Sequence, residues 1–294
     1  MKNFLITGAS GFIGNNFIKN FSNKNNLYYI LLKKSKKNKK FKNLFKDKNK
    51  KFIFFKKNSE IYTSLNKLKI NFFINFATHY TKDNDFKNTE QLIKSNILFP
   101  SLILESINKK YLKKVITFGS MQEHYQNKEY MPDCLYAATK KSLDKLFFFY
   151  KLKLTKIKFY NLKFYETYNA NDQRKKLVPI IKKNYTNNLT TTLASKKLNL
   201  NFLHVDDVCR AVNVIINKNI KSGEYQIQAK KFSNPKELID KFNKMNLKKI
   251  KYITKDNNIF NINYNIKKLP YWKQTTNIEN NFNHLLNENY KNKI

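Results

Sequence analysis

Residues 6–16 read ITGASGFIGNN and hold three of the five glycines in the 294-residue chain, Gly8, Gly11 and Gly14. They follow an apolar run at residues 4–7 and lead into apolar positions with helical spacing. A turn of glycines between a strand and a helix lets backbone N–H groups approach a pyrophosphate, because side chains would block that approach. In a chain so poor in glycine, this clustering predicts a dinucleotide site rather than an ordinary strand-to-helix turn.

Continuous apolar runs alternate with helical patterns along the first half of the chain. Runs typical of strands cover residues 4–7, 27–32, 51–55, 70–78, 113–120 and 155–165, and helices are predicted over 91–107 and 135–152. Strands without polar alternation are typical of a parallel sheet that is buried on both faces. The sequence therefore predicts an α/β fold, a doubly wound parallel (Rossmann) sheet of six or seven strands.

The pattern is looser after residue 165. A strand that turns into a helix is predicted over 202–216, with further helices over 234–245 and 276–288. We therefore predict a dinucleotide-binding domain over residues 1–165. Residues 166–294 are predicted to form mainly a smaller C-terminal substrate-binding region, with some segments returning to the first domain.

The net charge of +38 comes almost entirely from lysine, since arginine occurs only at positions 174 and 210. Lysines are spread along the chain, and the dense block at 33–51 is predicted to be a solvated loop or helix face. Arginine is the residue that bidentate base and phosphate recognition favours. We therefore attribute the charge to a biased amino-acid composition and expect no specific nucleic-acid partner.

No apolar run reaches the ~18–20 residues of a membrane span. Neither a membrane nor a leader segment is expected, and two cysteines favour a reducing cytoplasm.

Several later motifs follow the glycine turn in a recognisable order. INFFINFAT ends in Ala77 and Thr78, KSNILFPSLIL contains Asn96, LYAATKK contains Tyr136 and Lys140, and HVDDV and LPYWKQTTNIEN come last. Together they resemble the extended short-chain dehydrogenase/reductases, the NAD(P)-dependent epimerase/dehydratase family. HYQNKEYMPDCLYAATKKS and LKFYETYNANDQRKKLVPII are most similar to the branch of CDP-abequose synthase-like deoxysugar reductases.

The resemblance implies a nicotinamide dinucleotide cofactor and a set of residues around it. The implied cofactor-binding residues are Gly8, Ser10, Gly11, Phe12, Ile13, Gly14, Lys33, Ala77, Thr78, Asn96 and Lys140. An acidic residue at the end of the second strand would repel a 2′-phosphate. Because Lys33, Lys34 and Ser35 stand there instead, we predict that NADP(H) is favoured over NAD(H).

Tyr136 and Lys140 are four positions apart on a predicted helix, so they share a face. A nearby ammonium is expected to lower the pKa of the phenol, which could then exchange a proton with a carbonyl or an alcohol. The family's third catalytic group is a hydroxyl, but the gapless register places Met121 at that position. Met cannot donate a hydrogen bond, so we predict that Ser120, one residue earlier, serves with Tyr136 and Lys140.

Three further residues are candidates for substrate binding. Arg174 and Lys176 could clamp a substrate pyrophosphate, and His79 follows the fourth strand. No Cys/His cluster has metal-ligand spacing, so no metal is expected.

Together with these residues, the resemblance implies an NAD(P)-dependent reductase of a nucleotide-linked 4-keto-6-deoxy sugar. A nucleotide-sugar epimerase and a non-catalytic dinucleotide-binding protein are the alternatives. The TDE run of the dehydratases is replaced by Met121, Gln122 and Glu123, which makes dehydration the least favoured chemistry. The resemblance also implies a homodimer formed through the helices at 91–107 and 135–152.

Overall fold

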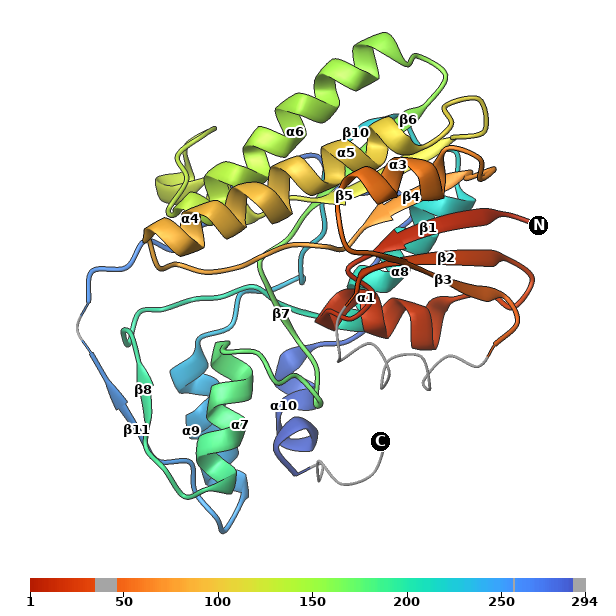
Figure 1. Cartoon of the computed structure of the whole chain (residues 1–294). Coiled ribbons are helices and arrows are strands. Elements are labelled where there is room, and N and C mark those ends of the chain that lie inside the picture. Colours follow the sequence, from red (N-terminus) through yellow and green to blue (C-terminus); the bar gives the residue numbers. More distant parts are fainter. Residues whose placement is uncertain (35–46, 256, 288–294) are drawn as a thin grey trace.

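A parallel sheet forms the centre of the molecule (Figure 1). The computed structural model describes residues 1–34, 47–255 and 257–287. In these ranges the sheet has seven strands in the order β10-β6-β5-β4-β1-β2-β3. The strands are β1 (Asn3–Thr7), β2 (Leu27–Lys33), β3 (Lys50–Phe55), β4 (Phe72–Asn75), β5 (Lys114–Phe118), β6 (Lys158–Lys163) and β10 (Gly223–Gln226). The predicted doubly wound parallel sheet is therefore confirmed.

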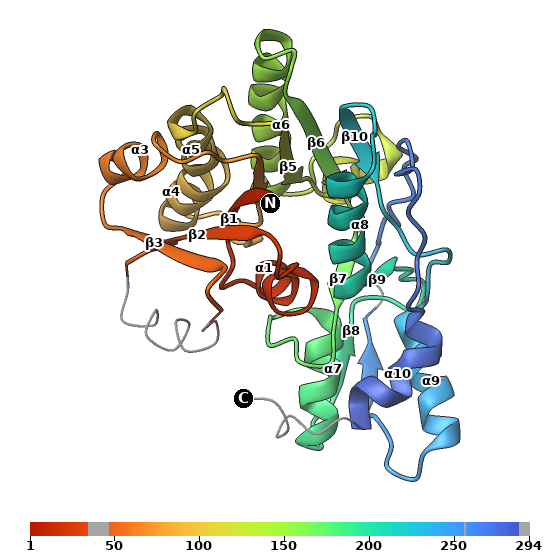
Figure 2. The ribbon, with the colours of Figure 1, turned by 90° about the vertical axis from the view of Figure 1, so that its right-hand side faces the viewer.

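Helices cover both faces of this sheet (Figure 2). On one face lie α3 (Ser59–Leu65), α4 (Phe86–Ile93), α5 (Phe99–Ser106) and α6 (Leu135–Lys153), and on the other lie α1 (Phe12–Asn16) and α8 (Val205–Asn217). Successive residues of β1 alternate between the two cores: Leu5 packs with the α3–α5–α6 side and Ile6 with the α1–α8 side. Burial on both faces explains the unbroken apolar runs.

The predicted helix at 91–107 differs from the observed one. It begins earlier, at Phe86, and a π-helical turn, η2 (Lys94–Leu98), separates α4 from α5. Pro100 lies two residues after the π turn, and the helix continues past it to Ser106. Several observed strands are shorter than predicted; β6, for example, covers 158–163 where 155–165 was predicted. Most of the lysine block at 33–51 lies outside the described residues.

A smaller lobe lies below the sheet in Figure 1. Its helices are α7 (Leu177–Thr186), α9 (Pro235–Met245) and α10 (Ile278–Asn287), and its paired strands are β7 (Glu166–Tyr168) with β9 (Phe202–His204) and β8 (Thr191–Leu193) with β11 (Tyr252–Thr254). An apolar core that includes Ile181, Phe242 and Phe282 holds the lobe together. Within the described ranges, no helix is both long and apolar enough to cross a bilayer.

Candidate active site

A cavity of about 1660 Å³ opens between the carboxyl ends of the central strands and the smaller lobe. It lies where the strand order reverses, with β1 and β4 adjacent, which is the usual position of a ligand in such sheets. The glycine turn, the ends of β2, β4 and β5, and the first turns of α6 line one side. Residues 198–200 and 258–262 line another side, and no sequence motif had marked them.

The glycine turn is closely packed against the loop that follows β4. Gly8 has a φ of +66°, and a Cβ there would lie 2.3 Å from the backbone nitrogen of Ala77. A Cβ on Gly14 would lie 2.3 Å from the carbonyl oxygen of Gly8. Both positions therefore exclude a side chain, so the backbone of this turn stays open to the cavity. Ser10, Gly11, Phe12 and Ile13 also line the cavity.

Tyr136 and Lys140 come from the first two turns of α6 and both line the cavity. The Lys140 Nζ lies 5.9 Å from the centre of the Tyr136 ring. Burial raises the pKa of the Tyr136 phenol above its ordinary value and lowers the pKa of Lys140 to about 8. Desolvation by burial is the largest cause of both shifts, so Lys140 does not produce the lowered phenol pKa that the sequence led us to expect. The phenol is protonated at neutral pH.

Ser120 also lines the cavity, at the start of the short 3₁₀ helix η3 (Met121–Glu123). Its hydroxyl accepts a hydrogen bond from the Gln122 N–H at 3.2 Å, as a helix cap does. The Met121 side chain is buried, and its sulfur lies 3.8 Å from the Gln226 side-chain nitrogen. Position 121 therefore offers no hydroxyl, whereas Ser120 keeps its hydroxyl proton for another partner.

A buried ion pair lies beneath this loop. Glu123 and Lys163 are both fully buried, with 2.8 Å between Oε2 and Nζ. The other Glu123 oxygen accepts the Ser120 N–H at 2.9 Å, which completes a capping box. Lys163 also contacts Glu224 at 3.0 Å and the His124 ring at 3.1 Å. Glu123 is not among the residues that line the cavity, so its carboxylate supports the loop. The predicted strand at 155–165 contains three lysines, and no sequence signal marked Lys163 as the buried one.

Asn96 is placed differently from the expectation that it binds cofactor. It is buried in the π turn η2 and is not among the cavity-lining residues. Its amide oxygen accepts hydrogen bonds from the His79 N–H at 2.7 Å and the Thr78 hydroxyl at 3.0 Å. Its amide nitrogen donates to the His79 carbonyl and to the Thr139 hydroxyl, both at 3.0 Å. All its hydrogen-bonding capacity is used inside the protein, so Asn96 holds the loop after β4.

The loop after β4 presents Ala77, Thr78 and Tyr80 to the cavity. His79 is not among the lining residues, and its ring Nε2 is buried without a hydrogen-bond partner. The structure therefore does not place His79 where a substrate would contact it. Tyr80, which the sequence did not single out, packs edge-on against Tyr136 with 4.8 Å between ring centres.

Arg174 and Lys176 line the cavity from the lobe side and reach across to the sheet side. The Arg174 guanidinium pairs with the buried Asp172 at 2.7 Å and lies 3.8 Å from the centre of the Phe12 ring in the glycine turn. Lys176 pairs with Glu166 at 3.1 Å, and its Nζ lies 3.8 Å from the centre of the Tyr80 ring. Two cations thus stand over the cavity close to both the glycine turn and Tyr136.

Lys33 ends β2 and lines the cavity beside Leu31 and Leu32. The strand end carries no acidic side chain in its described part, which extends to Lys34. A positive edge is therefore present where the adenosine ribose of a dinucleotide is expected.

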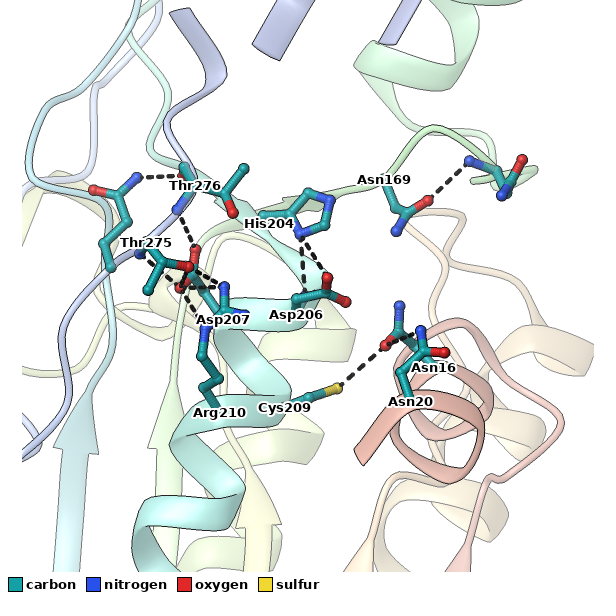
Figure 3. A network of polar contacts seen from close by, with 12 residues as sticks. Asn16, Asn20, Asn169, His204, Asp206, Asp207, Cys209, Arg210, Thr275 and Thr276 are labelled. Carbon is teal, nitrogen blue, oxygen red and sulfur yellow. Dashed lines mark hydrogen bonds and ion pairs between the residues drawn. The ribbon is translucent and has the colours of Figure 1, made fainter. Parts of the chain in front are cut away.

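A second polar network joins α8 to the segment that precedes α10 (Figure 3). The buried Asp207 carboxylate accepts the backbone N–H groups of Thr275 and Thr276 at 2.9 and 3.1 Å and pairs with Arg210 at 2.8 Å. Trp272 donates its indole N–H to the Asp207 carbonyl at 2.9 Å. The HVDDV and LPYWKQTTN motifs therefore have a structural role: their hydrogen bonds hold α8 against residues 272–276. Across the described ranges, no cluster of three His, Cys, Asp or Glu side chains is arranged to hold a metal ion.

Comparisons with known proteins agree with this architecture. CDP-abequose synthase of Salmonella muenchen is 28% identical over 167 residues, 55% of this chain and 54% of that protein, so the match spans about half the length of the relative. UDP-glucuronic acid 4-epimerase from Bacillus cereus has a TM-score of 0.79 at 17% identity, covering 97% of this chain and 96% of that one. dTDP-glucose 4,6-dehydratase from Bacillus anthracis has a TM-score of 0.75 at 17% identity with the same coverage.

The sequence also matches a known family over most of its length. The match covers residues 4–227, which include all of the central sheet but its first residue, the glycine turn, Tyr136 and Lys140. The resemblance read from the sequence motifs is thereby confirmed. The chain belongs to the NAD-dependent epimerase/dehydratase family.

Proposed function

We propose that this protein is an NADP(H)-dependent reductase of a nucleotide-linked 4-keto-6-deoxy sugar. The observation that carries the proposal is the position of the protonated Tyr136 phenol in the cavity that the glycine turn also lines. Reduction of a carbonyl needs a proton donor of this kind. The sequence resemblance to deoxysugar reductases, and the similarity to CDP-abequose synthase, supply the substrate class.

The residues around the glycine turn fit a dinucleotide. The space that a Cβ at Gly8 or Gly14 would fill is already occupied by backbone, which keeps the turn tight enough to cradle a pyrophosphate. When bound, the cofactor supplies the hydride. Ala77, Thr78 and Lys140 line the same cavity, where Ala77 and Thr78 would border the nicotinamide and Lys140 would hold its ribose. Tyr136 gives its proton to the carbonyl oxygen, which Ser120 polarises with its hydroxyl.

Two structural features favour reduction over the related reactions. Dehydration needs an acid and a base at positions 122 and 123, but Gln122 is an amide and the Glu123 carboxylate is committed to Lys163 and the Ser120 N–H. Epimerisation needs a second acid or base or a rotation of the sugar. Tyr80, a second phenol against Tyr136 in the cavity, makes epimerisation the second candidate.

The test is a panel of nucleotide-linked 4-keto-6-deoxy sugars incubated with NADPH while the absorbance of the reduced cofactor is followed. Stoichiometric loss of NADPH supports reduction, whereas isomerised sugar without net cofactor use supports epimerisation. Tyr136→Phe should abolish turnover. Ser120→Ala should lower kcat by about 10²-fold, as the loss of one transition-state donor does. Full turnover by Ser120→Ala would contradict the role given to Ser120.

Cofactor choice is tested separately by titrating NADPH and NADH against the pure protein. A positively charged strand end at Lys33 should favour the 2′-phosphate. Lys33→Glu should weaken NADPH binding and leave NADH binding less affected. Tighter binding of NADH by the wild-type protein would contradict the assignment.

We also propose that two copies of the chain pair through α4, α5 and α6. The exposed apolar side chains of α6, Leu146, Phe148, Phe149 and Leu152, lie on a helix that borders α4 and η2. A second copy would cover them. We expect a cytoplasmic location, since Cys134 and Cys209 are both unpaired thiols.

A further inference from the structure

The Arg174 side chain reaches from the smaller lobe to the glycine turn on the facing wall of the cavity. Its guanidinium carbon lies 3.8 Å from the centre of the Phe12 ring, and both residues line the cavity. Phe12 directly follows Gly11 in the turn that fits a pyrophosphate. A guanidinium over an aromatic face is attracted to the ring. The contact therefore places a positive charge beside the glycine turn.

The guanidinium is held in one orientation by residues of the lobe. Arg174 Nε donates to Asp172 Oδ1 at 2.9 Å, and Nη2 donates to Asp172 Oδ2 at 2.7 Å and to the Thr167 carbonyl at 2.8 Å. The Asp172 side chain is fully buried. Nη1, by contrast, donates no hydrogen bond to any residue in the part of the chain that the structure describes. Two N–H groups of a fixed cation therefore remain for a ligand in the cavity.

The loop that carries Arg174 is itself folded against the lobe. The Asp172 N–H donates to the Asn169 carbonyl at 3.2 Å, and the Arg174 N–H donates to Asp172 Oδ1 at 3.0 Å. The Lys182 side chain, in α7, donates to the Ala170 carbonyl at 3.0 Å. The guanidinium is thus presented to the cavity by a fixed loop, so little ordering is needed before it binds an anion.

Lys176, which the sequence analysis grouped with Arg174, contacts a different part of the cavity wall. Its Nζ lies 3.8 Å from the centre of the Tyr80 ring, and it pairs with Glu166 at 3.1 Å. The Tyr80 ring packs against Tyr136, where the proposed reaction occurs. Arg174 contacts the glycine turn instead. The two cations that the sequence assigned to one substrate pyrophosphate therefore face different parts of the site.

We infer that Arg174 binds the pyrophosphate of the dinucleotide cofactor and not that of the substrate. This assignment rests on the proposed function, in which a dinucleotide occupies the glycine turn. The turn offers backbone N–H groups from the sheet side, and Arg174 offers the Nη1 N–H groups and a positive charge from the lobe side. A planar guanidinium matches the oxygens of a phosphate, and hydrogen bonds between charged groups are the strong kind. The lobe then holds the cofactor as well as the substrate.

The test is the dissociation constant of NADPH, NADH and ADP-ribose, each measured by titration calorimetry without sugar. The pyrophosphate is the one charged group that all three ligands share. Arg174→Gln should raise all three dissociation constants by a similar factor of about 10 to 100, the range for hydrogen bonds to a charged group. Lys241→Gln is the matched control, since it removes an exposed lysine of α9 that is not among the cavity-lining residues. It should bind all three ligands as the wild type does.

A second variant separates binding from folding. Arg174→Gln leaves the buried Asp172 carboxylate without its cation, which destabilises the loop. Arg174→Lys keeps a cation beside Asp172 and should unfold near the wild-type temperature in the absence of ligand. It should still weaken all three ligands by a similar factor, because one ammonium cannot replace the guanidinium fork at Asp172 and at the pyrophosphate together. Wild-type affinity for the three ligands in Arg174→Lys and Arg174→Gln would overturn the inference.

The remaining outcomes distinguish this inference from the proposed function. If the wild type binds the three ligands but reduces no sugar of the panel, the proposed reaction fails, and the Arg174 variants still decide which residue holds the pyrophosphate. A loss of affinity limited to NADPH would place Arg174 at the 2′-phosphate and overturn the inference. A rise in the KM of the nucleotide sugar with unchanged dissociation constants would overturn it as well, because Arg174 would then hold the substrate.

Discussion

Replacing Gly14 by alanine places a methyl group where α1 meets the preceding turn. The added Cβ would lie 2.3 Å from the Gly8 carbonyl oxygen and 2.9 Å from its carbon, whereas ordinary contacts begin near 3.4 Å. Backbone must therefore separate by about 1 Å, because no side chain can rotate away. The Gly8 backbone cannot move away easily, because it packs closely against the backbone of Ala77. Overpacking of this kind costs about 1–3 kcal/mol.

We therefore expect Gly14→Ala to lose about 2 kcal/mol of unfolding free energy, measured by urea denaturation and the fluorescence of the single tryptophan, Trp272. The displaced N–H groups should weaken NADPH binding by about tenfold or more, which is about 1.4 kcal/mol. Gly223→Ala is the matched control, because a Cβ there meets no atom within 4 Å. Equal stability and equal NADPH affinity in the two variants would refute the reasoning.

Glu123→Gln should lower the unfolding free energy by about 3 kcal/mol, since it leaves Lys163 buried without its nearest carboxylate, and the half-exposed Glu224→Gln should cost less. An equal cost would contradict the assignment of Glu123 as the main partner. Lys140 has a native pKa of about 8 against 10.5 in the unfolded chain, so the unfolded state binds more protons between these values. The stability of the wild type relative to Lys140→Met should therefore rise by about 1 kcal/mol per unit from pH 8 to pH 10, and a flat difference in urea denaturation would contradict the lowered pKa. Phe149→Asp should convert the proposed dimer to a monomer in light scattering, and a wild-type protein that is already monomeric would contradict the α6 interface.

Much of the central fold could be predicted because its signals are local. A strand buried on two faces must be apolar throughout, and a turn that excludes Cβ atoms must be glycine, so residues 4–14 indicate both the sheet and its ligand turn. Tyr136 and Lys140 share a helical face by spacing alone. The boundaries were less certain, and the π turn at η2 was missed, because no local pattern of residues marks where the hydrogen bonding of a helix changes from α to π.

The sequence by itself determined the sheet, the glycine turn, the pairing of Tyr136 with Lys140 and the absence of a hydroxyl at position 121. Only the tertiary structure decided the pKa values of these groups and the contacts that fix their positions. The raised pKa of Tyr136 comes from burial, and the support beneath Ser120 comes from Glu123, which is paired with Lys163 on a different strand. Such contacts join segments far apart in the chain, and their geometry depends on how separate loops pack at one sheet edge, which no local pattern of residues encodes.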